Sequence, residues 1–347
     1  MPPMLDRLRK RLNAGKVPAF GPPAEPWATS YDGVATEQDI LGCFRLLLGR
    51  HPNPEEWRGH SARAGEDLAG VVASYLSSLE FAQRGLLAQD HLGQMELVDL
   101  DGFRLYVASG DAAVGRDVRD DRTYEPDVTA VFRRILKPGM GVLDLGANIG
   151  YFTMLSAALV GTEGLVVAVE PNPANVKLLE ASRRLNGFGQ VTACQVAAGR
   201  EPGLLVLNTS HSNGTTSGLP DDVNALLGAE IVPCVRGDSL VPSGRRVDLI
   251  KVDVEGAEHN ALLGCSETLT YWRPTIITEF SPTLMPGISG ISGPDYVRWL
   301  MGNGYAIGVV QPDGSVRPAP DADAVMAEFE AKGSDHVDLL ATPLDRA

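Results

Sequence analysis

Apolar runs of five to seven residues alternate with amphipathic segments through the second half of the chain. Each run is long enough for a buried strand, and apolar residues recur at helical spacing in the segments between the runs. We expect strands at 141–145, 165–169, 190–196, 247–252 and 274–280, and helices at 151–160, 173–186, 256–263 and 293–302. This alternation predicts an α/β fold with a doubly wound, mostly parallel sheet.

The pattern changes toward the end of the chain. Apolar stretches at 305–310, 314–316 and 337–341 predict a terminal antiparallel pair, so the last strand of the sheet should run in reverse. Residues 203–235 interrupt the alternation between the third and fourth strands with two short strand-like runs and polar turns. We interpret this segment as an insertion.

Three parts are expected along the chain. Residues 1–35 predict a short basic amphipathic helix followed by a proline-rich linker, and residues 36–93 predict a small all-α domain. Residues 94–347 carry the α/β pattern. This third part opens with a β-hairpin that turns at Asp101-Gly102, followed by a helix over 126–136.

Composition narrows the classes of function. The chain has 347 residues, a net charge of -14 and a pI of about 4.9, which argue against broad binding to nucleic acid or to an anionic membrane. No run of about 20 apolar residues occurs, so we expect no transmembrane segment. Four widely spaced cysteines predict reduced core residues rather than a metal cluster, in a cytoplasmic protein. Contact of residues 1–17 with a membrane surface and formation of a homo-oligomer stay open.

The turn after the first central strand is the first candidate for ligand binding. Gly146-Ala-Asn-Ile-Gly150 is rich in residues that tolerate positive φ, and it joins a buried strand to a helix. The second strand ends in Glu170, a carboxylate that can accept both hydrogen bonds of a ribose diol. Because Asp144 precedes Gly146, the pattern is D-x-G-x-N-x-G, whereas nicotinamide sites use G-x-G-x-x-G. The arrangement resembles that of class I methyltransferases, which favours S-adenosylmethionine as the cofactor.

Other residues are expected around the same cofactor. Asp144 would help to orient its amino-acid end, Asn172 would reach its nucleoside, and the backbone near Ala197 would contact its adenine. Tyr124 either covers the methionine end or packs as a core aromatic. The predicted cofactor-binding residues are Tyr124, Glu125, Asp144, Gly146, Asn148, Gly150, Glu170, Asn172 and Ala197.

Carboxylates after the fourth and fifth strands make a second candidate site. Methyl transfer to oxygen requires alignment of the acceptor and removal of its proton. Asp253 either takes that proton or accepts a hydrogen bond from the hydroxyl; alternatively, Asp253 and Glu279 hold a divalent cation. The sequence places no histidine to complete a cation site, so no metal is predicted. Glu255 is a candidate for substrate binding, and its alternative role is a favourable charge near a helix N-terminus.

The insertion supplies the remaining candidates. His211 lies in a polar loop that can fold over the cleft, so it is a candidate catalytic base, with a solvated surface position as the alternative. Ser212 and Asn213 are candidates for binding acceptor hydroxyl groups. His336, near the end of the chain, shows no pattern that indicates a role.

Three motifs resemble those of the FkbM family of methyltransferases. They are 143–150, 169–173 and 250–258, preceded by Tyr124-Glu125, and the resemblance covers roughly residues 95–345. It implies a class I methyltransferase domain with a Rossmann-like sheet and S-adenosylmethionine as cofactor. It also implies O-methylation of a hydroxyl on a sugar, a glycolipid or a polyketide.

The helical part carries a second resemblance. Phe44–Glu56 with Ser77–Phe81 is similar to a small helical domain of unknown function that accompanies enzymes acting on glycans. This association favours a sugar acceptor in a glycan, a glycolipid or a glycosylated natural product. Two alternatives stay open: a catalytically silent cofactor-binding module in a glycan-assembly complex, and methylation of a polyketide or peptide. The turn spacing and the reversed last strand disfavour a nicotinamide-dependent oxidoreductase.

Overall fold

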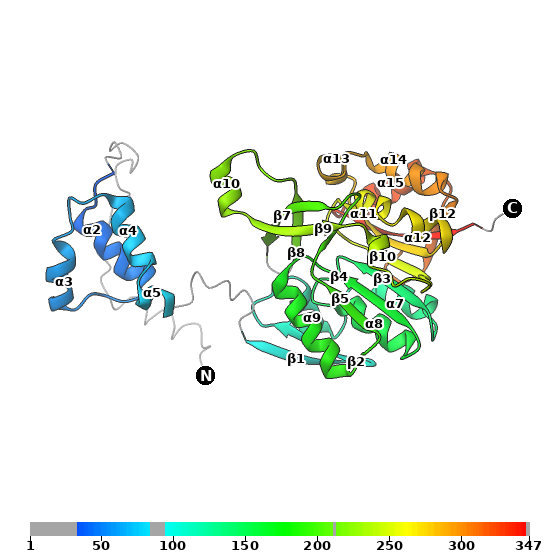
Figure 1. Ribbon diagram of the computed structural model, residues 1–347, viewed down its shortest axis with the longest axis horizontal. Helices are drawn as coiled ribbons and strands as arrows, with labels where there is room; N and C mark the ends of the chain where they lie inside the picture. Colours follow the sequence, from blue (N-terminus) through cyan, green and yellow to red (C-terminus); the bar gives the residue numbers. More distant parts are fainter. Residues whose placement is uncertain (1–32, 84–93, 211–212, 345–347) are drawn as a thin grey trace, which may run out of the picture. The chain divides into compact units, whose positions relative to one another are not determined.

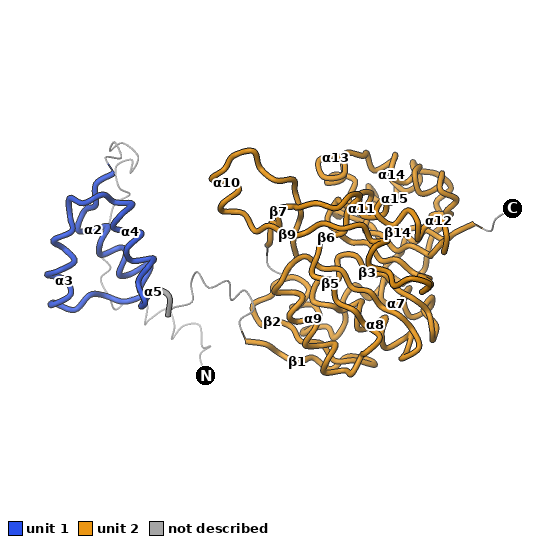
Figure 2. Tube along the Cα trace, viewed as in Figure 1, with its two compact units in different colours: residues 1–89 blue, residues 90–347 orange. Residues whose placement is uncertain are grey.

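The computed structural model describes residues 33–83, 94–210 and 213–344 (Figure 1). The chain divides into two compact units, residues 1–89 and residues 90–347 (Figure 2). Within the described ranges, each unit has a hydrophobic core of its own. The second unit holds the strands whose ends are predicted to bind ligands.

The smaller unit is helical where it is described. Thr36 and Asp39 form a reciprocal capping box at its first helix, and Asn53 and Glu56 form another at the next. Phe44 is buried in the core between the helices. The elements are α2 Glu37–Gly42, a π-helical turn Cys43–Leu47, α3 Pro54–Ser61, α4 Leu68–Leu76 and α5 Leu79–Gln83.

The larger unit is built on an eight-stranded sheet in the order β13-β12-β14-β11-β10-β3-β4-β5. Its strands are β3 Gly141–Leu145, β4 Leu165–Val169, β5 Val191–Cys194, β10 Leu249–Val252, β11 Thr275–Phe280, β12 Tyr305–Val310, β13 Val316–Ala319 and β14 Val337–Pro343. Strands β11, β10, β3, β4 and β5 are parallel, whereas β14 runs antiparallel to β11 and β12. This is the sheet of a class I methyltransferase, so the predicted fold class is confirmed.

Helices cover both faces of this sheet, because the central strands are buried on both sides. One face carries α6 Val114–Asp121, α7 Pro126–Ile135, α8 Tyr151–Val160 and α9 Pro173–Asn186, with the hairpin β1 Met95–Leu100 and β2 Phe103–Ala108. The other face carries α11 Glu258–Leu263, α12 Ser266–Tyr271, α13 Met285–Ile288, α14 Gly293–Gly302 and α15 Ala322–Lys332. Every helix in the described parts of the chain is too short or too polar to traverse a bilayer.

The insertion is more elaborate than the sequence predicts. It contains β7 Gly203–Ser210, β8 Asn213–Ser217, α10 Val223–Gly228 and β9 Glu230–Val235, and a 3-10 turn Gly237–Ser239 follows. The third strand stops early at Cys194, because the chain leaves the main sheet and β6 Ala197–Ala198 pairs with β9. The result is a second sheet in the order β6-β9-β7-β8 with its own small core.

The strand order of the main sheet reverses between β3 and β10, and the turns after these two strands touch. A Cβ atom on Gly146 would lie 1.8 Å from the carbonyl oxygen of Asp253, so only glycine fits this position. Gly146 also has a φ of +82°, which strains residues that carry a side chain. In an open α/β sheet, ligands bind at such a reversal, beyond the carboxyl ends of the strands. The fold therefore points to a site between these two turns.

Candidate active site

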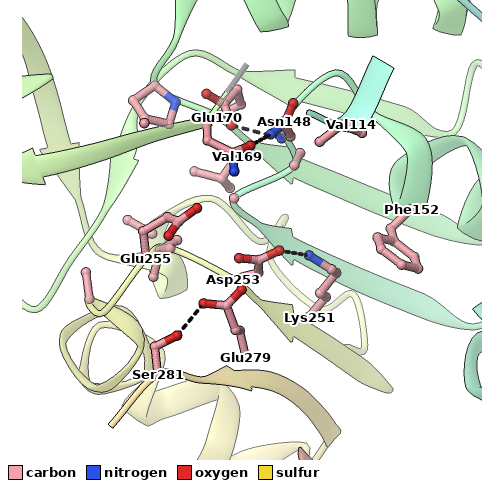
Figure 3. Close-up of a pocket in the computed structure, with 18 of the residues that line it drawn as sticks. Val114, Asn148, Phe152, Val169, Glu170, Lys251, Asp253, Glu255, Glu279 and Ser281 are labelled. Carbon is pink, nitrogen blue, oxygen red and sulfur yellow. Dashed lines mark hydrogen bonds and ion pairs between the residues drawn. The ribbon is translucent and has the colours of Figure 1, made fainter. Parts of the chain in front are cut away.

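A cavity of about 230 Å³ opens at the reversal point of the main sheet. Its wall includes the turns after β3, β4, β10 and β11, part of β8, and the residues just before β14. Figure 3 shows Asn148 and Glu170 on one side of the cavity, and Asp253, Glu255 and Glu279 on the other. The two clusters that the sequence predicts thus share one cavity.

The structure places ten of the predicted site residues on this wall. They are Tyr124, Glu125, Gly146, Asn148, Glu170, Ala197, Asn213, Asp253, Glu255 and Glu279. They come from seven separate segments of the chain, which only the folded sheet brings together.

Other predicted residues do not line the cavity. Asp144 is buried, and its Oδ2 accepts a hydrogen bond of 2.6 Å from Thr153 Oγ1. Gly150 lies against Leu179, with which a side chain at this position would collide. Asn172 caps the start of α9. The remaining two candidates, His211 and Ser212, lie outside the described residues.

Backbone amides hold the carboxylate of Glu170 at the end of β4. Its Oε2 accepts a hydrogen bond of 2.9 Å from the N–H of Asn148, and its Oε1 accepts one of 2.8 Å from the N–H of Asn172. Burial raises the pKa of Glu170 to about 7, although these bonds favour the ionised form. Oε1 also accepts a hydrogen bond of 3.5 Å from Nδ2 of Asn175. Because Oε2 accepts a single hydrogen bond from the described residues, Glu170 keeps acceptor capacity at this oxygen on the cavity wall.

One contact joins the insertion to this part of the site. Nδ2 of Asn148 donates a hydrogen bond of 3.1 Å to Oδ1 of Asn213, the first residue of β8. Gly214 and Thr216 of the same strand also line the cavity. The small sheet therefore forms part of the wall.

A buried lysine balances the acids on the other side. Nζ of Lys251 lies 2.8 Å from Oδ2 of Asp253, and the lysine side chain is 5% exposed. Burial opposes the charge of this lysine, but the carboxylates of Asp253, Asp144 and Glu125 together raise the pKa of Lys251. Lys251 is therefore an ammonium, and it fixes Asp253 in an ion pair.

Two further carboxyl groups on the wall hold their protons more tightly than usual. Burial, and then the charge of Asp338, raise the pKa of Glu125 to about 8. Burial, and then the neighbouring carboxylates, raise the pKa of Glu279 well above its ordinary value. Oε1 of Glu279 accepts a hydrogen bond of 2.8 Å from Ser281 Oγ. The wall thus combines ionised carboxylates with neutral ones.

The backbone of the wall is strained at several points. Five non-glycine residues of the described chain have a positive φ, and three of them line the cavity: Glu125 at +41°, Asn148 at +50° and Glu255 at +54°. The Glu255 turn is held by Glu258, whose Oε1 accepts hydrogen bonds from the N–H groups of Val254 and Gly256. Such strain is concentrated at functional sites in proteins.

Sequence reasoning missed one part of the wall. Asp335 and His336 line the cavity, although His336 shows no pattern in the sequence. Because β14 runs in reverse, its amino end lies at the same edge of the sheet as the carboxyl ends of the parallel strands. The general rule for ligand sites in open α/β sheets considers the carboxyl ends of parallel strands alone. Inside the described ranges, no three His, Cys, Asp or Glu side chains are arranged to hold a metal ion.

The sheet order, the glycine turn after β3 and the acid at the end of β4 define a class I methyltransferase. The family model described as the methyltransferase FkbM domain matches residues 144–332, more than half of the chain. The chain therefore belongs to the FkbM methyltransferase family. Membership of this family implies S-adenosylmethionine as the cofactor.

Several known proteins are similar to this chain. Methyltransferase 1 from Beauveria bassiana (strain ARSEF 2860) is 30% identical over 195 residues, which are 50% of this chain and 74% of that protein. Protein-L-isoaspartate O-methyltransferase 1 from Arabidopsis thaliana is 51% identical over 51 residues, which are 14% of this chain and 22% of that protein. The structure of methyltransferase FkbM from Methylobacillus flagellatus KT has 13% identity and a TM-score of 0.38, covering 86% of this chain and 58% of that chain. This chain thus spans less than two thirds of the last two proteins.

The residues on the wall fit S-adenosylmethionine. This cofactor carries a positive sulfonium, an ammonium and a ribose diol. The wall carries six carboxyl groups and one lysine, so it favours a cationic ligand. Glu170 offers acceptor capacity for the diol, and the turn Gly146–Gly150 brings backbone close to the cavity.

Proposed function

We propose that this protein is an S-adenosylmethionine-dependent O-methyltransferase that methylates a sugar hydroxyl in a glycan, a glycolipid or a glycosylated natural product. The observation that carries the proposal is that one cavity combines Glu170, an acid suited to ribose, with Asp253 and Glu279 on the opposite side. Glu255 and Asn213 add further hydrogen-bonding groups to the wall. A polyol can donate hydrogen bonds to several of these groups at once.

Each side chain has a distinct role in this proposal. Glu170 accepts hydrogen bonds from the ribose, and Asp253 accepts one from the acceptor hydroxyl. Lys251 orients Asp253 through their 2.8 Å ion pair. When bound, S-adenosylmethionine supplies a methyl group on a positive sulfur, and the electron pair of the broken C–S bond stays on sulfur. The protein contributes alignment, which is the larger part of what such a transfer requires.

The test is incubation of the full chain with S-adenosylmethionine labelled in its methyl group and a panel of acceptors. The panel contains methyl glycosides, hydroxyl compounds that are not sugars (glycerol, catechol and a seryl peptide) and a peptide carboxylate. We expect label in a methyl ether of a glycoside, which survives alkali. Label in an alkali-labile ester, or only in a compound that is not a sugar, would contradict the proposal. Binding of S-adenosylhomocysteine without transfer to any acceptor would favour a silent cofactor-binding module.

A further inference from the structure

The reversed strand β14 brings two more side chains to the cavity. Phe280 at the end of β11 pairs with Val337 at the start of β14. The next residues beyond this pair, Ser281 and His336, both line the cavity, and so does Asp335. Residues that precede a parallel strand would lie at the opposite edge of the sheet. The antiparallel direction of β14 therefore places His336 on the same cavity wall as Asp253, Glu255 and Glu279, the carboxyl groups on the acceptor side of the cavity.

His336 and Asp335 form an oriented pair. Nδ1 of His336 lies 2.9 Å from Oδ1 of Asp335. A carboxylate at this position holds a proton on Nδ1, so Nε2 becomes the basic nitrogen of the neutral ring. The side chain of His336 is 31% exposed and that of Asp335 is 88% exposed, so the pair lies where the cavity meets solvent.

We propose that His336 is the catalytic base that takes the proton of the acceptor hydroxyl, and that Asp335 is the positioning residue that orients its imidazole. The inference rests on the proposed O-methylation. The O–H bond breaks as the proton moves to Nε2 of His336, and the oxygen uses its electron pair for the new bond to the methyl carbon. The imidazolium then releases the proton to solvent.

The carboxyl groups on the wall are less suited to this step. Oδ2 of Asp253 is already paired with Nζ of Lys251, and protonation of Asp253 would leave a buried ammonium without its partner. Glu279 accepts a hydrogen bond from Ser281, and burial, then the neighbouring carboxylates, raise its pKa, which favours the neutral form. A neutral carboxyl can donate a hydrogen bond but has no negative charge with which to take a proton.

Glu255 and His336 line the same cavity. Burial, and then the charge of Asp253, raise the pKa of Glu255, and the charge of a protonated His336 opposes this rise. The imidazole is therefore within electrostatic reach of a carboxyl group on the acceptor side.

The first measurement needs no acceptor. The full chain, labelled with ¹⁵N-histidine, is saturated with S-adenosylhomocysteine, and the His336 signals are assigned by their loss in His336→Gln. We expect a neutral ring with its proton on Nδ1 and an unprotonated Nε2, and a shift toward the Nε2–H form in Asp335→Ala. A neutral ring protonated at Nε2 in the unsubstituted protein would overturn the proposal.

The second measurement uses the panel compound that the unsubstituted protein methylates fastest. In His336→Gln we expect kcat to fall about 10²- to 10⁴-fold, the usual contribution of a general base, while the Kd for S-adenosylhomocysteine stays within about twofold. In His336→Ala, added imidazole should restore part of the rate. The matched control is His51→Gln, an exposed histidine of the smaller unit, which should leave kcat unchanged.

The outcomes separate this inference from the proposed function. An unchanged kcat in His336→Gln, or an equal loss of kcat and cofactor affinity with no rescue by imidazole, would overturn the role of His336. If methyl transfer occurs only to a compound that is not a sugar, the proposed sugar acceptor is contradicted. The role of His336 as a base is then tested with that compound as the acceptor. If no panel compound is methylated, the proposed function fails and the ring tautomer decides whether His336 is set up as a base.

Discussion

Lys251 and Asp253 form an ion pair of 2.8 Å at the end of β10, where both side chains line the cavity. The two residues are separated by one position, so a strand directs them to the same side. Lys251 also lies with its Nζ 4.9 Å from the ring centre of Phe152, a contact that stabilises a cation. The positive charge of Lys251 therefore offsets part of the negative charge of a wall that is rich in carboxyl groups.

Substitution Lys251→Met should therefore destabilise the fold. It leaves Asp253 and Asp144 without the charge that offsets them, and a buried pair broken on one side costs about 3–5 kcal/mol. We expect a loss of this size in the free energy of unfolding by urea at pH 7. The loss should be smaller at lower pH, because burial raises the pKa of Asp144, and protonation of Asp144 removes a charge that Lys251 offsets. Lys177→Met, at an exposed position of α9, is the control and should change stability by less than about 0.5 kcal/mol. Equal losses in the two variants would show that Lys251 has no such role.

The contact between Gly146 and Asp253 leads to a second prediction. In Gly146→Ala the new Cβ would lie 1.8 Å from the Asp253 carbonyl oxygen, so the turns after β3 and β10 must separate. We expect weaker binding of S-adenosylhomocysteine in calorimetry and a lower free energy of unfolding. The control is Gly187→Ala, which has a φ of +68° and no atom within 4 Å of the added Cβ. Gly187→Ala should lower the free energy of unfolding only by the cost of a left-handed backbone, about 1–2 kcal/mol, and should leave the affinity for S-adenosylhomocysteine unchanged. Equal affinities in the two variants would refute the prediction.

Periodicity was sufficient to predict most of the main sheet. The parallel strands are continuous apolar runs because both of their faces are buried, and such runs are visible in the sequence. The turn Gly146–Gly150 was recognisable because its residue types suit positive φ. Glu170 and Asp253 could be located because each follows a strand directly, and parallel strands end at a common edge.

Features that depend on long-range pairing could not be predicted in this way. Ala197 and Ala198 look like the end of the third strand, but they pair with Cys234 and Val235 from the far end of the insertion. The role of the residues before β14 depends on which neighbour that strand pairs with, and in which direction. The sequence predicts a reversed last strand, yet the consequence for His336 requires the register of β14 against β11.

Cofactor affinity should depend on Glu170 and on pH. Burial raises the pKa of Glu170 to about 7, and ribose hydroxyl groups donate to its ionised form. Affinity for S-adenosylhomocysteine should therefore increase as the pH rises toward 7, by up to about tenfold per pH unit, and level off above it. Calorimetry between pH 5.5 and about 8.5 measures this slope.

Substitution Glu170→Ala isolates that dependence. We expect a loss of about 1–3 kcal/mol in binding free energy at pH 8, because the ribose and two backbone amides lose their acceptor, together with a flat pH profile. Glu163→Ala, an exposed position just before β4, is the control and should keep the slope of the unsubstituted protein. A slope that persists in Glu170→Ala would assign the titration to another group.

Glu258 gives a stability prediction with a definite sign. This residue is fully buried, and burial raises its pKa from 4.5 to about 7. Its Oε2 has no hydrogen-bond partner among the described residues. Between these values the folded state binds a proton that the unfolded state has lost, so folding stability falls as pH rises. The stability that this bound proton contributes is fully present below about pH 4.5 and is lost above about pH 7.

Substitution Glu258→Gln removes this titration but keeps a side-chain oxygen for the N–H groups of Val254 and Gly256. The difference in unfolding free energy between variant and unsubstituted protein should therefore move in favour of the variant, by up to about 3 kcal/mol, between pH 4.5 and pH 8. Glu267→Gln is the control, because Glu267 lies in the first turn of α12 but is exposed. Urea unfolding at several pH values measures both differences. A difference in unfolding free energy for Glu258→Gln that stays constant with pH, or that moves in favour of the unsubstituted protein, would contradict the prediction. Either result would show that Glu258 is ionised in the folded state and that the helix N-terminus, rather than burial, sets its pKa.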